Sequence, residues 1–475
     1  MIAKKQISFG TDGWRAVMAR EFTFDNVALV AQSIADHVNH AGKGGKGIVV
    51  GYDARFLSEQ FAALVADVLG ANGIPVLVVD RDTPTPVTAY TIKARDLAGA
   101  VMLSASHNPP EYHGIKFIPD YLHPALPADT DPIVARIAQL QADPGAVRTG
   151  GPKPEIIDPK PDYLAHIRQL IDLDAIRKAN LVVCVDPLHA AGRGYLSDIL
   201  EEAGCDVHTI HNERNPLFGG SLPEPNERNL EALSDLVRDT RANVGLSMDG
   251  DADRFGMVDE NGKYITSNQV IALTLWHWVR TRGKGPVVRT VATSGLIDAL
   301  AADLGVDVIE TPVGFKWVGS AMKANDAAVG GEESGGLSVR GHIPEKDGIV
   351  ADLALTEMIA TTGRTPGDIL SEIEATTGKF VATRIDLRLP DSAKLDLMRR
   401  LREETPATLA GQNIVSVNPA DGVKMVREDR SWLLVRPSGT EPLVRCYMEA
   451  RSPEGIEELK AAVHALAPGA ELGGH

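Results

Sequence analysis

The sequence predicts an α/β fold, made of three related, doubly wound α/β domains and a smaller C-terminal α+β domain. Three observations support this prediction. At 475 residues the chain is too long for a single hydrophobic core. Apolar runs of strand length alternate with segments of helical period in three successive units, which is typical of a mostly parallel sheet covered by helices. From about Thr377 the pattern changes to the apolar alternation of an antiparallel sheet.

The first unit begins with a helix that Thr23 can cap, because apolar residues recur after it at helical spacing. Short apolar segments at 48–53, 74–79 and 98–103 predict buried strands. A second helix is expected at 58–69. The third strand leads directly into the sequence SASHNPP. Ligands of such sheets bind at the carboxyl ends of strands, so this loop is a candidate site.

The same plan recurs twice and is followed by a different domain. A proline-rich linker at 151–163 separates the first two units. The elements expected beyond it are strands at 181–186 and 243–249 with a helix at 229–240, then a helix at 268–280 with strands at 286–291, 306–310 and 327–331, and finally alternating strands within 380–389 and 432–450. The expected domains are therefore 1–157, 158–263, 264–376 and 377–475.

Composition and charge limit the possible functions. Hydrophobic residues make up 44% of the chain and charged residues 24%, which excludes a disordered or fibrous protein. The net charge of −16 argues against unselective binding to nucleic acid or to an anionic membrane. An anionic substrate therefore needs positive groups that are gathered locally.

The chain carries no sign of export or of membrane insertion. Cys184, Cys205 and Cys446 show no paired spacing and are expected to be reduced thiols. The first residues include lysines, but no apolar segment of a signal peptide follows them. The longest apolar runs have the length of strands and fall far short of a membrane span. We therefore expect a cytoplasmic protein.

The first candidate loop, here called the serine loop, is SASHNPP at 104–110. Ser106 beside His107 could act as a nucleophile, with the two prolines stiffening the loop. Taken alone, the pattern fits a polar turn better, in which Ser and Asn side chains cap backbone groups. His113 and Lys116 follow closely and add a histidine and a cation.

The second candidate, the aspartate loop, is DGDADR at 249–254. Three carboxylates this close repel one another unless a cation lies among them, and oxygen ligands suit Mg²⁺. An EF-hand is the closest alternative, since Glu260 falls at its twelfth position. It is excluded because Arg254 stands where the EF-hand turn needs glycine and because a strand precedes the loop. The expected metal ligands are Asp249, Asp251 and Asp253.

The third candidate, the glycine loop, is GGEESGG at 330–336. Its glycines allow a ligand to approach the backbone, while Glu332 and Ser334 offer acceptors and a donor to sugar hydroxyls. A purely structural loop fits these residues equally well. Lys316 and Lys346 lie nearby in the sequence and could balance an anionic substrate or transfer a proton.

The fourth candidate, the arginine loop, is RPSGTEP at 436–442, with Arg445 after it. An arginine at the end of a strand and a turn rich in hydroxyl and backbone donors suit a phosphate better than a carboxylate, because a phosphate has more oxygens to satisfy. An ordinary hairpin turn is the alternative. The donors come from Arg436, Ser438, Gly439 and Thr440.

In this order, the four loops resemble those of the α-D-phosphohexomutases, the phosphoglucomutase/phosphomannomutase family. The N-terminal FGTDGWR at 9–15 is also similar to the opening motif of that family. The matches run from Phe9 to Arg445, nearly the whole chain. The resemblance implies three related α/β domains and a fourth, smaller domain arranged around a central cleft. It also implies an intramolecular phosphotransferase that acts on a hexose phosphate, as a monomer or dimer.

The resemblance also assigns residues. It makes Ser106 a phosphoserine whose phosphate completes the coordination of Mg²⁺ by the aspartate loop. The implied catalytic residues are Ser106, His107, Lys116, Lys316, Arg15 and Arg254. The implied substrate-binding residues are Glu332, Ser334, Lys346, Arg436, Ser438, Gly439, Thr440 and Arg445. Of these, Arg436, Ser438, Gly439 and Thr440 match the site for the phosphate that does not react.

The implied reaction is a two-step exchange. The phosphoserine gives its phosphoryl group to a free hydroxyl of the hexose monophosphate, and the resulting hexose 1,6-bisphosphate turns over in the cleft and returns its other phosphate. The first phosphoserine must come from an activator, glucose 1,6-bisphosphate. Positioning and charge neutralisation account for most of such catalysis.

The sequence departs from part of the family at Gly336, where many phosphomannomutase-type members carry a histidine that is a proposed proton carrier. The segment GFK at 314–316 resembles the lysine loop of glucose-type phosphoglucomutases, so Lys316 is expected to replace it, with His107 and Lys116 as helpers. These features favour a phosphoglucomutase. A phosphomannomutase, a dual-specificity phosphohexomutase and a phosphoglucosamine mutase remain alternatives.

Two other classes of protein remain open. A metal-dependent phosphomonoesterase also uses a serine, a divalent ion and a phosphate pocket. It has no need of a sugar loop or of a second phosphate site in another domain. A non-catalytic sugar-phosphate sensor has no need to keep Ser106 together with three aspartates.

Overall fold

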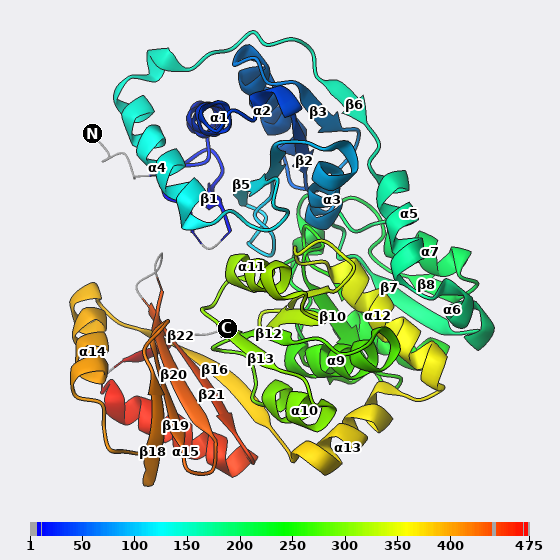
Figure 1. Cartoon of the computed structure of the whole chain (residues 1–475), viewed down its shortest axis with the longest axis vertical. Coiled ribbons are helices and arrows are strands. Elements are labelled where there is room, and N and C mark those ends of the chain that lie inside the picture. The colour runs from blue at the N-terminus through cyan, green and yellow to red at the C-terminus, as the bar shows by residue number, and fades with distance from the viewer. Residues whose placement is uncertain (1–6, 11, 439–442, 469, 474–475) are drawn as a thin grey trace.

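The computed structural model describes residues 7–10, 12–438, 443–468 and 470–473. Domains I to IV denote the four units in chain order, each with the sheet described below, so that β11 (Tyr264–Ile265) belongs to domain II and α13 (Pro366–Thr377) to domain III. Figure 1 shows domain I in blue and cyan at the top, domains II and III in green and yellow beside and below it, and domain IV in orange and red at the lower left. Each unit carries its own sheet, so the predicted three α/β domains and the smaller fourth domain are confirmed.

Domain I is a six-stranded mixed sheet in the order β1-β5-β4-β2-β3-β6. The inner strands β4, β2 and β3 are parallel, whereas β5 and β1 run antiparallel to their neighbours. Thr23 caps α1 by accepting a hydrogen bond from the Asn26 backbone N–H at 3.3 Å, as its position predicts. The elements are β1 (Trp14–Val17), α1 (Phe24–His40), β2 (Ile48–Tyr52), α2 (Ser58–Ala71), β3 (Val76–Val79), α3 (Thr85–Arg95), β4 (Gly99–Leu103), β5 (Tyr112–Pro119), α4 (Pro127–Ala142) and β6 (Glu155–Ile157).

Domains II and III repeat this mixed design. Their sheets have the orders β11-β10-β9-β7-β8 and β13-β12-β14-β15, each with parallel inner strands and an antiparallel edge. Domain II contains α5 (Lys160–Leu170), α6 (Leu173–Ala179), β7 (Val182–Asp186), α7 (Leu196–Glu202), β8 (Asp206–Thr209), α8 (Glu231–Thr240), β9 (Val244–Met248), β10 (Phe255–Val258) and β11 (Tyr264–Ile265). Domain III contains α9 (Ser267–Arg282), β12 (Val287–Thr290), α10 (Leu296–Leu304), β13 (Val308–Thr311), α11 (Phe315–Asn325), β14 (Val329–Glu332), β15 (Gly336–Val339), α12 (Gly348–Thr362) and α13 (Pro366–Thr377).

Domain IV is an antiparallel sheet in the order β17-β18-β19-β20-β21-β16-β22 with two helices. The predicted segment 432–450 divides into two of these strands, with the arginine loop between them. The elements are β16 (Val381–Arg388), α14 (Asp391–Glu403), β17 (Thr408–Leu409), β18 (Gln412–Asn418), β19 (Val423–Arg427), β20 (Trp432–Pro437), β21 (Leu443–Ala450), α15 (Pro453–Leu466) and β22 (Glu471–Gly473).

The main hydrophobic cores follow the domains except at the boundary of domains II and III, and smaller clusters cross the boundaries between domains I and II and between domains III and IV. Domains I and IV each have a core of their own. Domains II and III share one continuous core, because α12 packs against α6, β9 and β10 of domain II and also against α9 of domain III. Among the described residues, no helix combines the length and the apolar character needed to cross a membrane.

Candidate active site

The serine, aspartate and glycine loops meet where domains I, II and III join. The serine loop follows β4, the aspartate loop links β9 to β10, and the glycine loop links β14 to β15. A Cβ added to Gly250 would lie 2.3 Å from the carbonyl oxygen of Ser106, so the aspartate loop passes against the serine loop. Arg254 forms an isolated β-bridge with Gly336, and the Gly348 N–H donates to the Ala252 carbonyl at 3.0 Å. These backbone contacts join the three loops.

Ser106 is held at the centre of this junction. Its side chain is fully buried, and its hydroxyl donates to Asp249 Oδ2 at 2.6 Å. Its φ of +51° lies in the left-handed region, which few serines adopt. The Ser106 Oγ also lies 3.2 Å from His107 Nδ1. The serine loop is thus a constrained turn whose hydroxyl faces the aspartates.

The three predicted metal ligands form one buried cluster. Asp249, Asp251 and Asp253 each offer an oxygen within 4.8 Å of the others. Asp251 Oδ1 and Asp253 Oδ1 are buried and have no hydrogen-bond partner among the described residues. Burial and the two neighbouring carboxylates raise the pKa of Asp249 well above its usual value. Buried carboxylate oxygens without hydrogen bonds fit a hard divalent cation such as Mg²⁺, so the donor set suits the predicted metal.

Lys116 lies beside this cluster on β5. Its ammonium donates to Asp251 Oδ2 at 2.8 Å and to Asp253 Oδ2 at 2.9 Å, and it pairs with Asp12 at 2.9 Å. Burial alone would lower the pKa of Lys116, but these three carboxylates outweigh it and raise the pKa. Lys116 is therefore a fixed positive charge at the site.

Lys346 extends the same network from domain III. Its Nζ lies 3.3 Å from Asp253 Oδ2, 3.4 Å from Asp12 Oδ2 and 3.5 Å from a Glu345 oxygen. Burial favours its neutral form, yet the surrounding acids raise the pKa of Lys346. Burial raises the pKa of Glu345 to about 8 in spite of the adjacent lysine. Sequence reasoning missed Asp12 and Glu345, although Asp12 lies inside the FGTDGWR motif and Glu345 directly precedes Lys346.

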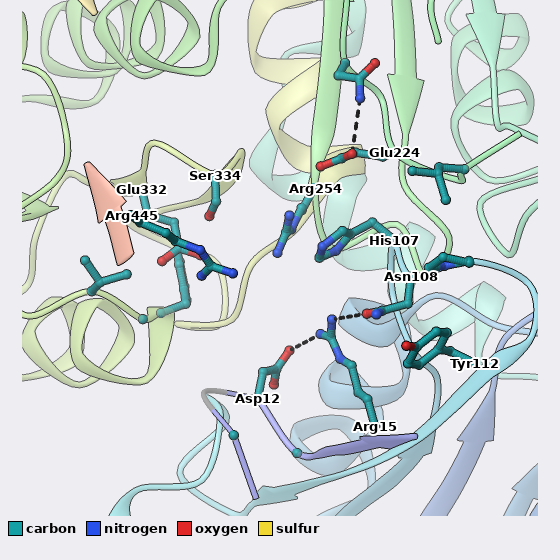
Figure 2. Close-up of a pocket in the computed structure, with 18 of the residues that line it drawn as sticks. Asp12, Arg15, His107, Asn108, Tyr112, Glu224, Arg254, Glu332, Ser334 and Arg445 are labelled. Carbon is teal, nitrogen blue, oxygen red and sulfur yellow. Dashed lines mark hydrogen bonds and ion pairs between the residues drawn. The ribbon is translucent and has the colours of Figure 1, made fainter. Parts of the chain in front are cut away.

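A cleft of about 3370 Å³ opens above this junction and is lined by residues of all four domains. In Figure 2, Glu332, Ser334 and Arg445 lie on one side of it and Arg254 and His107 on the other. Ser106, Lys116 and the three aspartates are buried beneath its wall. Eight of the predicted site residues line the cleft: Arg15, His107, Arg254, Glu332, Ser334, Lys346, Arg436 and Arg445.

Two arginines and a histidine line the cleft next to the serine loop. Arg15 donates to Asn108 Oδ1 at 2.9 Å, a contact drawn in Figure 2. The Nε of Arg254 is buried, forms an ion pair with Asp253 Oδ1 at 4.0 Å and has no hydrogen-bond partner in the described part of the chain, so it can still donate to an anion. Burial, together with the charge of Arg254, lowers the pKa of His107 well below its usual value, so this imidazole is neutral.

The glycine loop presents Glu332 and Ser334 to the cleft. Burial and, to a smaller extent, the negative charge of Glu333 raise the pKa of Glu332 to about 7. A Cβ added to Gly336 would lie 2.7 Å from Cδ of Lys346. The lysine side chain thus occupies the space next to Gly336, where a larger residue would not fit without displacing it.

The arginine loop lies at the domain IV side of the cleft. Arg436 is oriented by Asp421, whose two carboxylate oxygens each lie 2.9 Å from its Nε. Asp421 also accepts a hydrogen bond from the Val313 N–H of domain III at 2.9 Å. Ser438 is buried at the end of the described segment. The predicted phosphate contacts Gly439 and Thr440 lie outside the described residues.

Lys316 is placed differently from the other predicted residues. It lies on α11 with its Nζ 5.8 Å from the centre of the Trp317 ring. It is absent from the cleft lining, where the described neighbours Gly314 and Phe315 are found instead. Burial lowers the pKa of Lys316. Among the described residues, the structure brings the other predicted site residues to the junction or the cleft, whereas Lys316 lies at the edge of the cleft, close enough to Asp12 for that carboxylate to act on its pKa.

Comparisons with known proteins agree with this geometry. Four sequence models of the phosphoglucomutase/phosphomannomutase family match in order: alpha/beta/alpha domain I at residues 6–143, domain II at 161–262, domain III at 266–376 and the C-terminal domain at 385–466. The phosphoglucomutase/phosphomannomutase of Thermococcus kodakarensis is 30% identical, over 95% of this chain and 96% of the relative. A Pyrococcus abyssi protein named a probable phosphoglucosamine mutase is 31% identical, over 95% of each chain.

A solved structure extends the similarity to three dimensions. The crystal structure of a Thermus thermophilus protein, provisionally designated a phosphomannomutase, superposes with a TM-score of 0.86 at 33% identity. The match covers 98% of this chain and all of the other. Together with the four matching domains, this similarity shows that the chain belongs to the phosphoglucomutase/phosphomannomutase family of phosphohexomutases.

Proposed function

We propose that this phosphohexomutase is a phosphoglucomutase, which interconverts α-D-glucose 1-phosphate and glucose 6-phosphate through phospho-Ser106 and glucose 1,6-bisphosphate. The observation that carries the proposal is the Ser106 hydroxyl, held 2.6 Å from a buried cluster of three aspartates beneath a cleft lined by arginines. Asp249, Asp251 and Asp253 would hold Mg²⁺, and the ion would neutralise charge on the transferring phosphoryl group.

In the first step, the bond between phosphorus and Ser106 Oγ breaks while a bond forms to a hydroxyl oxygen of the sugar. That hydroxyl loses its proton to a base of the protein, and the serine oxygen leaves as the alkoxide or takes up a proton. Arg15 and Arg254 line the cleft beside the serine loop and are suited to neutralise the phosphoryl oxygens. The second step repeats this transfer in reverse with the other phosphate of the bisphosphate.

The lysines divide into two roles. Acidic neighbours raise the pKa of Lys116 and of Lys346, so both remain ammonium ions and neutralise charge. We retain Lys316 as the proton carrier that the resemblance implies, because it directly follows the cleft residues Gly314 and Phe315 and because burial lowers its pKa, which favours release of a proton. His107 is a second candidate, because it is neutral and its ring lies 3.2 Å from the Ser106 hydroxyl.

The sugar and its second phosphate occupy the rest of the cleft. Glu332 and Ser334 are suited to contact sugar hydroxyls, and Arg436 and Arg445 the phosphate that does not react. The predicted phosphate-binding set also includes Ser438, Gly439 and Thr440. A cleft lined by all four domains is wide enough for the bisphosphate to exchange its two ends, which a simple phosphomonoesterase does not need.

The sugar preference rests on residues rather than on relatives, because relatives of similar identity carry different sugar names. The absence of a histidine at Gly336, with Lys346 in that space, favours the glucose type. Glucose and mannose differ only in the orientation of one hydroxyl. One hydrogen bond in a partly hydrated site is worth about 0.5–1.5 kcal/mol, which is roughly a factor of 2–13 in kcat/KM.

The test is a direct comparison of kcat/KM for the 1-phosphates of glucose, mannose and glucosamine, with Mg²⁺ and glucose 1,6-bisphosphate present. We expect glucose 1-phosphate to be preferred, mannose 1-phosphate to react detectably and glucosamine 1-phosphate to react little. Equal or faster turnover of mannose 1-phosphate would make the enzyme a phosphomannomutase or a dual-specificity enzyme. Release of inorganic phosphate without isomerisation would instead indicate a phosphomonoesterase.

A further inference from the structure

Arg55, just after β2 in domain I, has its guanidinium group buried beneath the serine loop. The side chain is fully inaccessible to solvent. Its Nε donates to Asp53 Oδ2 at 3.1 Å. An arginine has five N–H donors, and here the other four reach four backbone carbonyls within one short segment. These acceptors are the carbonyl oxygens of Ser106 (2.6 Å), Asn108 (2.6 Å), Pro109 (2.7 Å) and Tyr112 (3.0 Å).

The guanidinium itself is held by neighbours from domains I and II. Asp53 is fully buried and also accepts hydrogen bonds from the Arg55 N–H and from the Ser58 hydroxyl, each at 3.1 Å. The guanidinium carbon lies over the Phe218 ring of domain II, 5.0 Å from the ring centre. Arg55 is thus a rigid part of the boundary between domains I and II.

The carbonyls to which Arg55 donates belong to the turn that orients the Ser106 hydroxyl. Ser106 has a φ of +51°, a conformation that costs a non-glycine residue of the order of 1–3 kcal/mol unless its surroundings maintain it. On one side of this turn the hydroxyl faces Asp249, and on the other the carbonyl oxygen faces Arg55. Without the guanidinium, all four carbonyls would lose a hydrogen bond, and of these the Pro109 carbonyl would keep the one that it accepts from the Tyr112 N–H at 3.0 Å.

We infer that Arg55 is a positioning residue for phosphoryl transfer: its five hydrogen bonds fix the left-handed conformation of Ser106 and thereby aim Oγ at the metal cluster. This inference rests on the proposed role of Ser106. A lysine supplies the same charge, but its three donors radiate from one atom and cannot reach four carbonyls and a carboxylate. The planar fork of arginine is therefore required, rather than its charge alone.

The test compares Arg55→Lys with Arg427→Lys. Arg427 is an equally buried arginine in domain IV, whose donors reach Ser431, Asp429 and Glu458 and make no contact with the serine loop. Wild type and both variants are treated with glucose 1,6-bisphosphate and Mg²⁺. The phosphoserine is observed by phosphorus NMR, kcat and KM for glucose 1-phosphate are measured, and thermal unfolding reports stability.

Both variants are expected to lose stability. Only Arg55→Lys should shift or broaden the phosphoserine resonance and lower kcat about 100-fold, with little change in KM, because a misplaced reacting atom slows the transfer more than it weakens sugar binding. A folded Arg55→Lys protein with the wild-type resonance and kcat would overturn the inference. If that variant does not fold, Asp53→Asn, which weakens the hold on Nε, should give the same change of resonance and kcat.

The outcome for wild type separates this inference from the proposed function. Absence of a phosphoserine at Ser106 in the wild-type protein would overturn both. A phosphorylated wild type together with an unchanged, folded Arg55→Lys protein would overturn the positioning role alone. A phosphorylated wild type with a displaced resonance in Arg55→Lys and a normal one in Arg427→Lys supports both.

Discussion

At the scale of single residues, the site depends on buried polar atoms whose hydrogen bonds orient the reacting group. Ser106 illustrates this. Its hydroxyl has a strong acceptor in Asp249, and its backbone adopts an unfavourable conformation that the surrounding loops maintain. Neither feature contributes to a hydrophobic core. The conformational free energy that this arrangement costs has a function if the hydroxyl carries the phosphoryl group.

Replacement of Ser106 by alanine should therefore remove turnover while the fold remains intact. The change deletes one hydroxyl and no apolar contact, so the thermal midpoint should change little, whereas kcat should fall about 1,000-fold or more because the covalent carrier is lost. The measurement is mutase activity with glucose 1,6-bisphosphate added, alongside circular dichroism. Near-normal activity of the folded variant would reject the phosphoserine mechanism.

Lys116 shows what the sequence could not reveal at this scale. The sequence predicted a cation near the serine loop but not the acids that it contacts. A buried lysine is stable only beside acids. Its partners Asp251 and Asp253 lie 135 and 137 residues away in the chain, so nothing in the local sequence indicates these ion pairs. Arg55 was missed for the same reason, because its acceptors are backbone carbonyls more than fifty residues away. The aspartates themselves were predictable, since all three stand in one short loop.

At the scale of elements, local signals predicted most of the fold. Strand-length apolar runs and the Thr23 cap identified β2, β4 and α1. The strand β5 was not predicted, because His113 and Lys116 make its sequence resemble that of a polar loop. Its antiparallel pairing with both β1 and β4 places these two residues inside the sheet, where both are buried. The antiparallel edges that make these sheets mixed were missed similarly, since strand direction depends on long-range pairing.

The contact between the serine and aspartate loops predicts the effect of Gly250→Ala. The new Cβ would lie 2.3 Å from the Ser106 carbonyl oxygen, a backbone atom that cannot move aside alone. The two loops must separate, which should destabilise the protein by about 1–3 kcal/mol. It should also lower kcat about 100-fold, because Oγ moves away from the metal cluster.

Gly45→Ala is the matched control for this change. A Cβ at Gly45 meets no atom within 4 Å, so this variant should keep the wild-type kcat. Both proteins are assayed for kcat and for thermal unfolding. Wild-type kcat in Gly250→Ala would show that the close approach of the two loops is not needed for catalysis.

At the scale of the whole molecule, the metal cluster lies where three domains join. The aspartates come from domain II, Ser106 and Lys116 from domain I, and Lys346 from domain III. Domain IV is fastened to domain III instead, through Asp421 and the Val313 N–H and through Lys424, which donates to the Val291 carbonyl at 2.7 Å. An ion bound at the junction should therefore stabilise the first three domains together.

The last prediction follows from that position. Mg²⁺ should raise the thermal midpoint of domains I to III, because the folded cluster binds the ion and the unfolded chain does not. At a concentration about 100 times the dissociation constant, the gain is about 2.7 kcal/mol. Asp251→Asn removes a ligand and should lose most of this increase in the thermal midpoint.

Asp186→Asn is the control. Asp186 is a buried carboxylate at the end of β7, and its oxygens accept from the Leu188 N–H and contact His211. Its replacement should lower the midpoint without Mg²⁺ but keep the increase that Mg²⁺ causes. Calorimetry with and without Mg²⁺ measures both, and an equal increase in wild type and in Asp251→Asn would show that the aspartate cluster does not bind the ion.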